Sequence, residues 1–150
     1  MNNLKYLILL FVLISCKKEI VNTEPKKYIV EKIEYIRFDI RGEVKINIDS
    51  NLQTSFEHNK GHYDKIISQK QNGKIISEDY EKITAILNNV DFPKLKNEYW
   101  TPMSDAPIRD IKITYNGGMI KKINDAGIPE KSILNQLYKK LDNIKIYRNK

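Results

Sequence analysis

The sequence of 150 residues contains a single cysteine, Cys16. No disulfide bond can form within the chain, so its folded part must be stabilised by packing and hydrogen bonds. The sequence also lacks a Gly-x-Ser-x-Gly elbow and a glycine-rich phosphate loop, because Gly117-Gly118 has too few glycines and follows a strand pattern. These absences exclude the commonest nucleophile and phosphate-binding motifs.

Long hydrophobic runs are absent too, apart from residues 6–14. The eleven residues 4–14 would extend roughly 16 Å as a helix, about half of the hydrocarbon core of a bilayer. A short run behind the positively charged Lys5 is typical of a secretory signal peptide. The sequence therefore predicts export rather than a membrane-spanning helix.

The residues that follow the run, Leu13-Ile14-Ser15-Cys16, resemble a bacterial lipobox. The resemblance implies alkylation of the Cys16 thiol with diacylglycerol, cleavage before Cys16 and often acylation of the new amine. The acyl chains, palmitate among them, then anchor Cys16 to a membrane. Residues 1–15 are then the signal peptide, and residues 16–28 are the lipidated cysteine and a flexible tether. Lys17 favours the outer membrane over the inner one in a Gram-negative cell. The alternative is an ordinary signal peptide with an incidental cysteine.

Charge does not point to nucleic acid, although the formal net charge is +7. The lysines are scattered singly or in pairs among acidic residues, as on a solvated surface. Export would also remove the protein from nucleic acid. We therefore expect no nucleic-acid partner.

Hydrophobic periodicity predicts one α+β domain over residues 29–147, followed by a short tail at residues 148–150. Apolar residues alternate with polar ones in the β pattern in several segments. These are residues 36–40, 44–48, 52–58, 111–115 and 119–124, with a weaker strand at residues 62–68, a turn at residues 59–61 and a loop at residues 69–74. The expected fold is an antiparallel meander with two amphipathic helices on one face, in the order ββββ-α-ββ-α.

Two segments show the 3.6-residue period of a helix. The first begins behind Ser77 as N-cap and is about thirteen residues long, with Tyr80, Ile83 and Leu87 at helical spacing. The second follows Pro129, which suits the first turn of a helix. Its apolar stripe consists of Ile133, Leu134, Leu137, Tyr138, Leu141 and Ile144.

Several of these features together resemble a family of bacterial envelope proteins known as domain of unknown function 6438. They are Phe92-x-x-Leu95, Tyr99, Ser104-Asp105-Ala106-Pro107, Gly117-Gly118, Asp125, Pro129 and Leu137-x-x-x-Leu141-Asp142. The similarity extends from about Ile36 to Ile144, and the family name implies no activity. Members usually carry a Cys-x-Gly-x-Cys-Pro-like segment between the first two strands, where this chain has Asp39-Ile40-Arg41-Gly42-Glu43. The resemblance therefore implies no redox, metal or disulfide role here.

Metal and carboxylate sites find little support in the sequence. His58 and His62 are four residues apart, which on a helix would direct both imidazoles at one metal, but we expect them to flank a turn at Gly61. Asp105 and Asp125 have no spacing that indicates a glycosidase pair. We predict no metal site, no catalytic residue and no cofactor.

The candidate binding residues lie between residues 99 and 110. Tyr99, Trp100 and Met103 lie close in sequence to Asp105 and Arg109, and aromatic residues beside an arginine are common anchors of interfaces. The alternative is that Tyr99 and Trp100 close the core while Asp105 shapes a turn. Three functions stay open: a non-enzymatic, lipid-anchored binding or scaffolding module with an envelope protein partner, a small envelope hydrolase, and an inhibitor of an extracellular enzyme. The lack of a catalytic motif favours the first.

Overall fold

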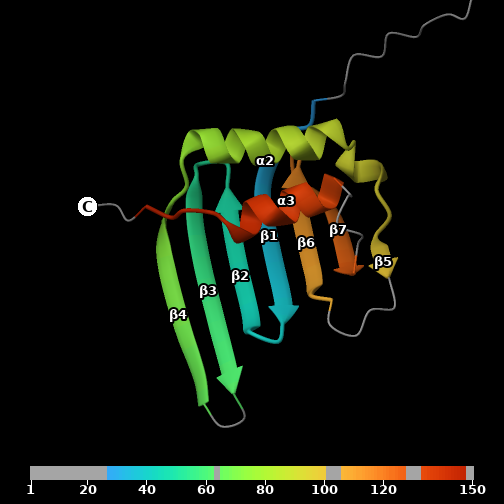
Figure 1. Ribbon diagram of the computed structural model, residues 1–150. Helices are drawn as coiled ribbons and strands as arrows, with labels where there is room; N and C mark the ends of the chain where they lie inside the picture. The colour runs from blue at the N-terminus through green and yellow to red at the C-terminus, as the bar shows by residue number, and fades with distance from the viewer. Residues whose placement is uncertain (1–26, 63–64, 101–105, 128–132, 148–150) are drawn as a thin grey trace, which may run out of the picture.

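The computed structural model describes residues 27–62, 65–100, 106–127 and 133–147. The predicted signal peptide and Cys16 lie outside these residues. In chain order the elements are β1 Val30–Asp39, β2 Gly42–Asp49, β3 Gln53–His62, β4 Lys65–Lys74, α2 Ser77–Asn89, the 3-10 turn η1 Phe92–Lys94, β5 Glu98–Trp100, β6 Ile108–Tyr115, β7 Met119–Ala126 and α3 Ile133–Asp142. Both helices lie over one face of the sheet (Figure 1), and the expected α+β class is confirmed.

The expected antiparallel meander in the order ββββ-α-ββ-α is wrong. The sheet has seven strands in the order β4-β3-β2-β1-β6-β7-β5, and its last pair, β5 with β7, is parallel. After α2 the chain passes through η1 to the far edge of the sheet and adds β5 there (Figure 1). A three-residue strand contains too little alternation to be recognised in a sequence.

The hairpin of β3 and β4 is longer than expected. The predicted turn at residues 59–61 is part of β3, and the predicted loop at residues 69–74 is part of β4. The two strands are in register from Gln53↔Lys74 to His62↔Lys65. Because β4 is an edge strand with mostly polar side chains, backbone pairing holds it in the sheet and no apolar alternation marks it.

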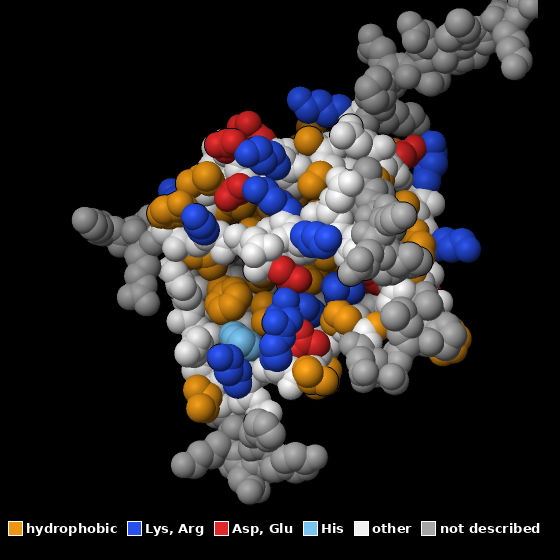
Figure 2. All heavy atoms as spheres, viewed as in Figure 1, with side chains coloured by type: hydrophobic (Ala, Val, Ile, Leu, Met, Phe, Trp, Pro, Cys, Tyr) orange, Lys and Arg blue, Asp and Glu red, His pale blue; other side chains and the backbone are white. Residues whose placement is uncertain are grey.

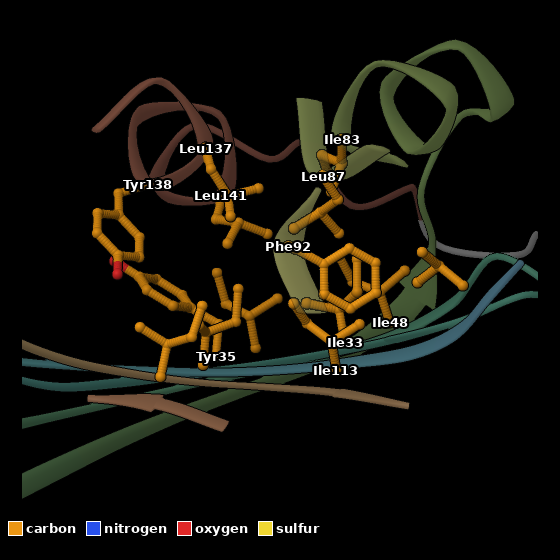
Figure 3. Packing of buried hydrophobic residues seen from close by; sticks show 14 of the residues in the cluster. Ile33, Tyr35, Ile48, Ile83, Leu87, Phe92, Ile113, Leu137, Tyr138 and Leu141 are labelled. Carbon is orange, nitrogen blue, oxygen red and sulfur yellow. The ribbon is translucent and has the colours of Figure 1, made fainter. Parts of the chain in front are cut away.

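The core lies between the helices and the sheet (Figure 3). Ile83 and Leu87 of α2 and Leu137 and Leu141 of α3 are fully buried against the sheet. Each such side chain contributes about 1.5–3 kcal/mol of hydrophobic stabilisation. Beneath them lie the buried residues of the central strands, including Ile33, Tyr35, Ile46, Ile48, Ile111, Ile113 and Ile123.

Local details of α2 partly match the sequence prediction. The helix has thirteen residues, as expected, with Glu78 and Asp79 in its first turn. The N-cap is Ile76 rather than Ser77, and the Ser77 hydroxyl donates instead to Glu81 Oε1 at 2.8 Å. Pro129, expected in the first turn of the last helix, lies outside the described residues. No helix in the described part of the chain is long and apolar enough to cross a membrane.

Candidate functional site

Near one end of the sheet, the apolar side chains change from the helix-covered face to the open face. On β1, the buried Ile33 and Tyr35 face the helices, and the next residue on that face is Arg37. On the opposite, open face the same strand carries Phe38, whose exposed fraction is 57%. The apolar alternation at residues 36–40 therefore marks the open face of the sheet and not the core.

A row of apolar side chains crosses the open face at this end. Phe38 is paired with Ile108, Ile108 with Ala126, and Ala126 with Trp100. Cross-strand neighbours in register lie on the same face, with strands about 4.8 Å apart. We call Phe38, Ile108, Ala126 and Trp100 the apolar row. Its three large members are 57%, 46% and 77% exposed.

A row of charged and polar side chains crosses the helix-covered face, one residue further along the strands. Arg37 is paired with Arg109, and Arg109 with Asp125. On the other side of β1 the row continues through Val44 to His58. We call Arg37, His58, Arg109 and Asp125 the charged row. It begins where the apolar core under α3 ends.

Arg37 is held by two carboxylates. Its Nη1 lies 2.9 Å from Asp142 Oδ1, at the end of α3, and its Nε lies 3.2 Å from Asp39 Oδ2. Arg41 approaches the same Asp39 oxygen at 2.9 Å through Nη2. Burial by itself would raise the pKa of Asp39, but the hydrogen bonds from Arg41 and the charge of Arg37 lower it overall. The network ties the sheet to the C-terminal end of α3.

Two stacked tyrosines lie between the core and this network. Their rings are 5.8 Å apart and nearly parallel, with Tyr35 on β1 and Tyr138 on α3 (Figure 3). The Tyr35 hydroxyl donates to Asp142 Oδ1 at 3.1 Å. Burial and the charge of Asp142 raise the pKa of Tyr35, and burial and the charge of Asp125 raise that of Tyr138. Both phenols are therefore poor general bases at neutral pH.

The predicted binding residues divide between the two rows. Trp100 belongs to the apolar row, whereas Arg109 belongs to the charged row and lies 4.9 Å from the Tyr138 ring centre. Tyr99 is in register with Asp125 and packs against the core, so the core interpretation holds for Tyr99 but not for the exposed Trp100. Met103 and Asp105 lie outside the described residues.

The arrangement of the two histidines differs from the expected one. His58 and His62 belong to one strand, β3, rather than flanking a turn. Positions four residues apart on a strand are separated by roughly 13 Å along it, so a strand does not bring them together as a helix would. Among the described residues no three His, Cys, Asp or Glu side chains are grouped closely enough to hold a metal.

A family profile matches most of the chain. The profile described as Domain of unknown function (DUF6438) matches residues 42–145. The chain belongs to this family. The DUF6438 match begins at β2 and extends past α3, so it includes His58, Trp100 and Arg109 but neither Arg37 nor Phe38. No curated protein matches the chain.

The residues that were not predicted from the sequence as site residues include Arg37, Asp39, Asp142 and Phe38. A change of phase in the apolar alternation could have indicated them. On β1 the apolar positions are odd at Ile33 and Tyr35 and become even at Ile36 and Phe38. Because successive side chains of a strand point to opposite faces, such a change means that the apolar face switches sides.

Proposed function

We propose that this DUF6438 protein is a lipid-anchored, non-enzymatic binding module of the bacterial cell envelope, with an envelope protein as its partner. The apolar row carries the proposal. A single exposed hydrophobic residue is ordinary, but Phe38, Ile108 and Trp100 belong to one continuous row across four strands. Aromatic anchors of this kind are enriched in protein interfaces.

The alternative of an envelope hydrolase has weaker support. A hollow of about 480 Å³ on the open face is lined by three acidic residues, Glu34, Glu98 and Asp110. A general acid needs a raised pKa, yet Lys112 and Lys32 lower the pKa of Glu34 against the effect of its partial burial. Asp110 accepts a hydrogen bond from Asn124 at 2.6 Å. These contacts suit a polar sheet surface better than acid catalysis.

The anchor is tested by fractionation and by labelling with radioactive palmitate. The wild-type protein should incorporate palmitate and sediment with membranes, and separation of inner from outer membranes should place it in the outer one. The Cys16→Ser variant should incorporate none and stay in the supernatant. Equal labelling and sedimentation of both proteins would show that Cys16 is not the anchor.

The partner surface is tested by photo-crosslinking in intact cells. A photoreactive residue is placed at Phe38 or at Trp100, and as a control at Ile76, which is also exposed but lies on the helix side. We expect the first two positions to give the same discrete adduct with an envelope protein, and the control to give none. An adduct that forms equally from all three positions, or no adduct from Phe38 and Trp100, would refute the proposed surface.

A further inference from the structure

A second surface lies on the opposite face of the sheet from the apolar row. A pocket of about 680 Å³ opens beyond the end of α3 and is lined by Arg37, Ile40, Arg41, His58, Lys60, Gly61 and Ile67. We call it the basic pocket. Figure 2 shows basic side chains and a histidine gathered below the helices on this face, with hydrophobic side chains beside them. The volume is typical of a site for a small molecule.

The lining of the basic pocket is cationic. It contains two arginines and one lysine, and no carboxylate. Asp39 and Asp142 lie next to it and pair with the arginines, so three cationic side chains face two carboxylates. None of the ion pairs among the described residues involves Lys60. One positive charge remains uncompensated, which matches a single negative charge on a ligand.

The guanidinium groups are positioned before any ligand arrives. Asp39 contacts both Arg37 Nε and Arg41 Nη2, and Asp142 contacts Arg37 Nη1. A guanidinium has five N–H donors, and the ion pairs involve two nitrogens of Arg37 and one of Arg41, while Arg37 Nε makes no hydrogen bond among the described residues. Donors therefore remain for a ligand oxygen, and the ordering that binding requires is already partly in place.

His58 forms part of the pocket wall. Its Nε2 is buried and has no hydrogen-bond partner among the described residues. Its ring lies 6.3 Å from the Phe56 ring in an edge-to-face arrangement, which restricts its orientation. His58 therefore contributes to the wall of the pocket, and the guanidinium groups supply the donors for a ligand.

The remaining walls are aliphatic. Ile40 in the β1–β2 turn and Ile67 on β4 line the pocket and are 93% and 58% exposed. Covering them would bury apolar surface that the fold itself leaves in water. A ligand that fits both parts has one anionic group and a hydrocarbon chain. We propose that the basic pocket binds the carboxylate of an aliphatic acid, with the chain against Ile40 and Ile67.

Calorimetric titration tests this proposal. The full chain carries Cys16→Ser, so that no acyl group of its own competes, and is dialysed free of detergent. The probes are decanoate, decanol and inorganic phosphate. We expect saturable 1:1 binding of decanoate, and at least tenfold weaker binding of decanol and phosphate, since each lacks one half of the ligand.

Variants connect the binding to the pocket. Arg41→Gln and Lys60→Gln each remove one exposed charge, and each should weaken decanoate binding about five- to tenfold. Lys122→Gln, which removes an exposed charge from β7, is the matched control and should leave binding unchanged. Unchanged far-UV circular dichroism would show that the variants are folded.

Several results would overturn the proposal. Equal binding of decanol would mean that the charges contribute nothing, and equal binding of phosphate would mean a general anion site. No saturable decanoate binding, or unchanged binding in both pocket variants, would equally reject it. Because the assay uses no membrane and no envelope partner, its failure leaves the proposed function standing, and the reverse also holds.

Discussion

Replacing Tyr35 by phenylalanine should change how the stability of the protein depends on pH. The side chain is fully buried, and its hydroxyl donates to Asp142 Oδ1 at 3.1 Å. Below pH 9 the variant loses this hydrogen bond, which stabilises the fold by about 1 kcal/mol. In this range we therefore expect the wild-type protein to be the more stable of the two.

At alkaline pH the difference should disappear. Burial and the charge of Asp142 raise the pKa of Tyr35, so the folded protein keeps the phenolic proton where an unfolded chain, with a pKa of about 10, loses it. The stabilisation that comes from the raised pKa is fully present below pH 10 and is lost as the pH rises toward the pKa of Tyr35 in the folded protein. The loss is about 1.4 kcal/mol per pH unit above 10. Between pH 9 and 11 the wild-type protein should lose about 1.4 kcal/mol relative to Tyr35→Phe.

Urea unfolding followed by far-UV circular dichroism at pH 7, 9, 10 and 11 measures this difference. Taking wild type minus variant cancels the titration of lysines, which both proteins share. Tyr147→Phe is the control for the removal of a phenolic hydroxyl, because that residue is half exposed. If the free energies of unfolding of wild type and Tyr35→Phe ran parallel from pH 9 to 11, the Tyr35 hydroxyl could not lie in the buried environment described above.

Three further predictions concern the stability of the fold, and all are measured by urea unfolding at pH 7. Gly42→Ala should destabilise the protein by more than about 3 kcal/mol, because φ is +114° and a Cβ would lie 2.1 Å from the Asn59 carbonyl oxygen. The control is Gly117→Ala, which should cost only about 1–2 kcal/mol, because φ is +80° but a Cβ would meet no atom. Equal costs for the two variants would contradict the close approach at Gly42. Leu87→Ala should cost about 2–5 kcal/mol, and a cost below 1 kcal/mol would mean that α2 is not seated on the core. Arg37→Ala should cost about 2–4 kcal/mol, because it removes the cation that Asp39 and Asp142 share. A neutral effect would show that the ion pairs are solvated.

The parts of the fold that the sequence predicts are those with local, strongly periodic patterns. The helix that begins at Ser77 has thirteen residues as expected, because apolar residues recur at helical spacing and acidic residues occupy its first turn. Strand β2 alternates cleanly because Val44, Ile46 and Ile48 are buried between polar neighbours. In both elements the local preference and the tertiary environment agree.

The parts that could not be predicted depend on distant partners. Strand β5 has only three residues and exists because β7 offers a free edge, which no local pattern reveals. Strand β4 is polar along most of its length and is defined by its register with β3. The network at Arg37 joins residues more than 100 positions apart, so its members become neighbours only once α3 has docked on the sheet.

The apolar side chains change from one face of the sheet to the other near one end, which explains why both proposed surfaces lie at that end. Toward the other end, Ile33, Tyr35, Ile111 and Ile113 face the helices, so the helices cover that area. At the charged row the helix side becomes polar, and α3 ends there with Asp142 on Arg37. A carboxylate is unfavourable at the C-terminal end of a helix unless a cation compensates it, which Arg37 does. Helix cover therefore stops at the level where the apolar side chains move to the open face, leaving the basic pocket uncovered on one side and the apolar row on the other.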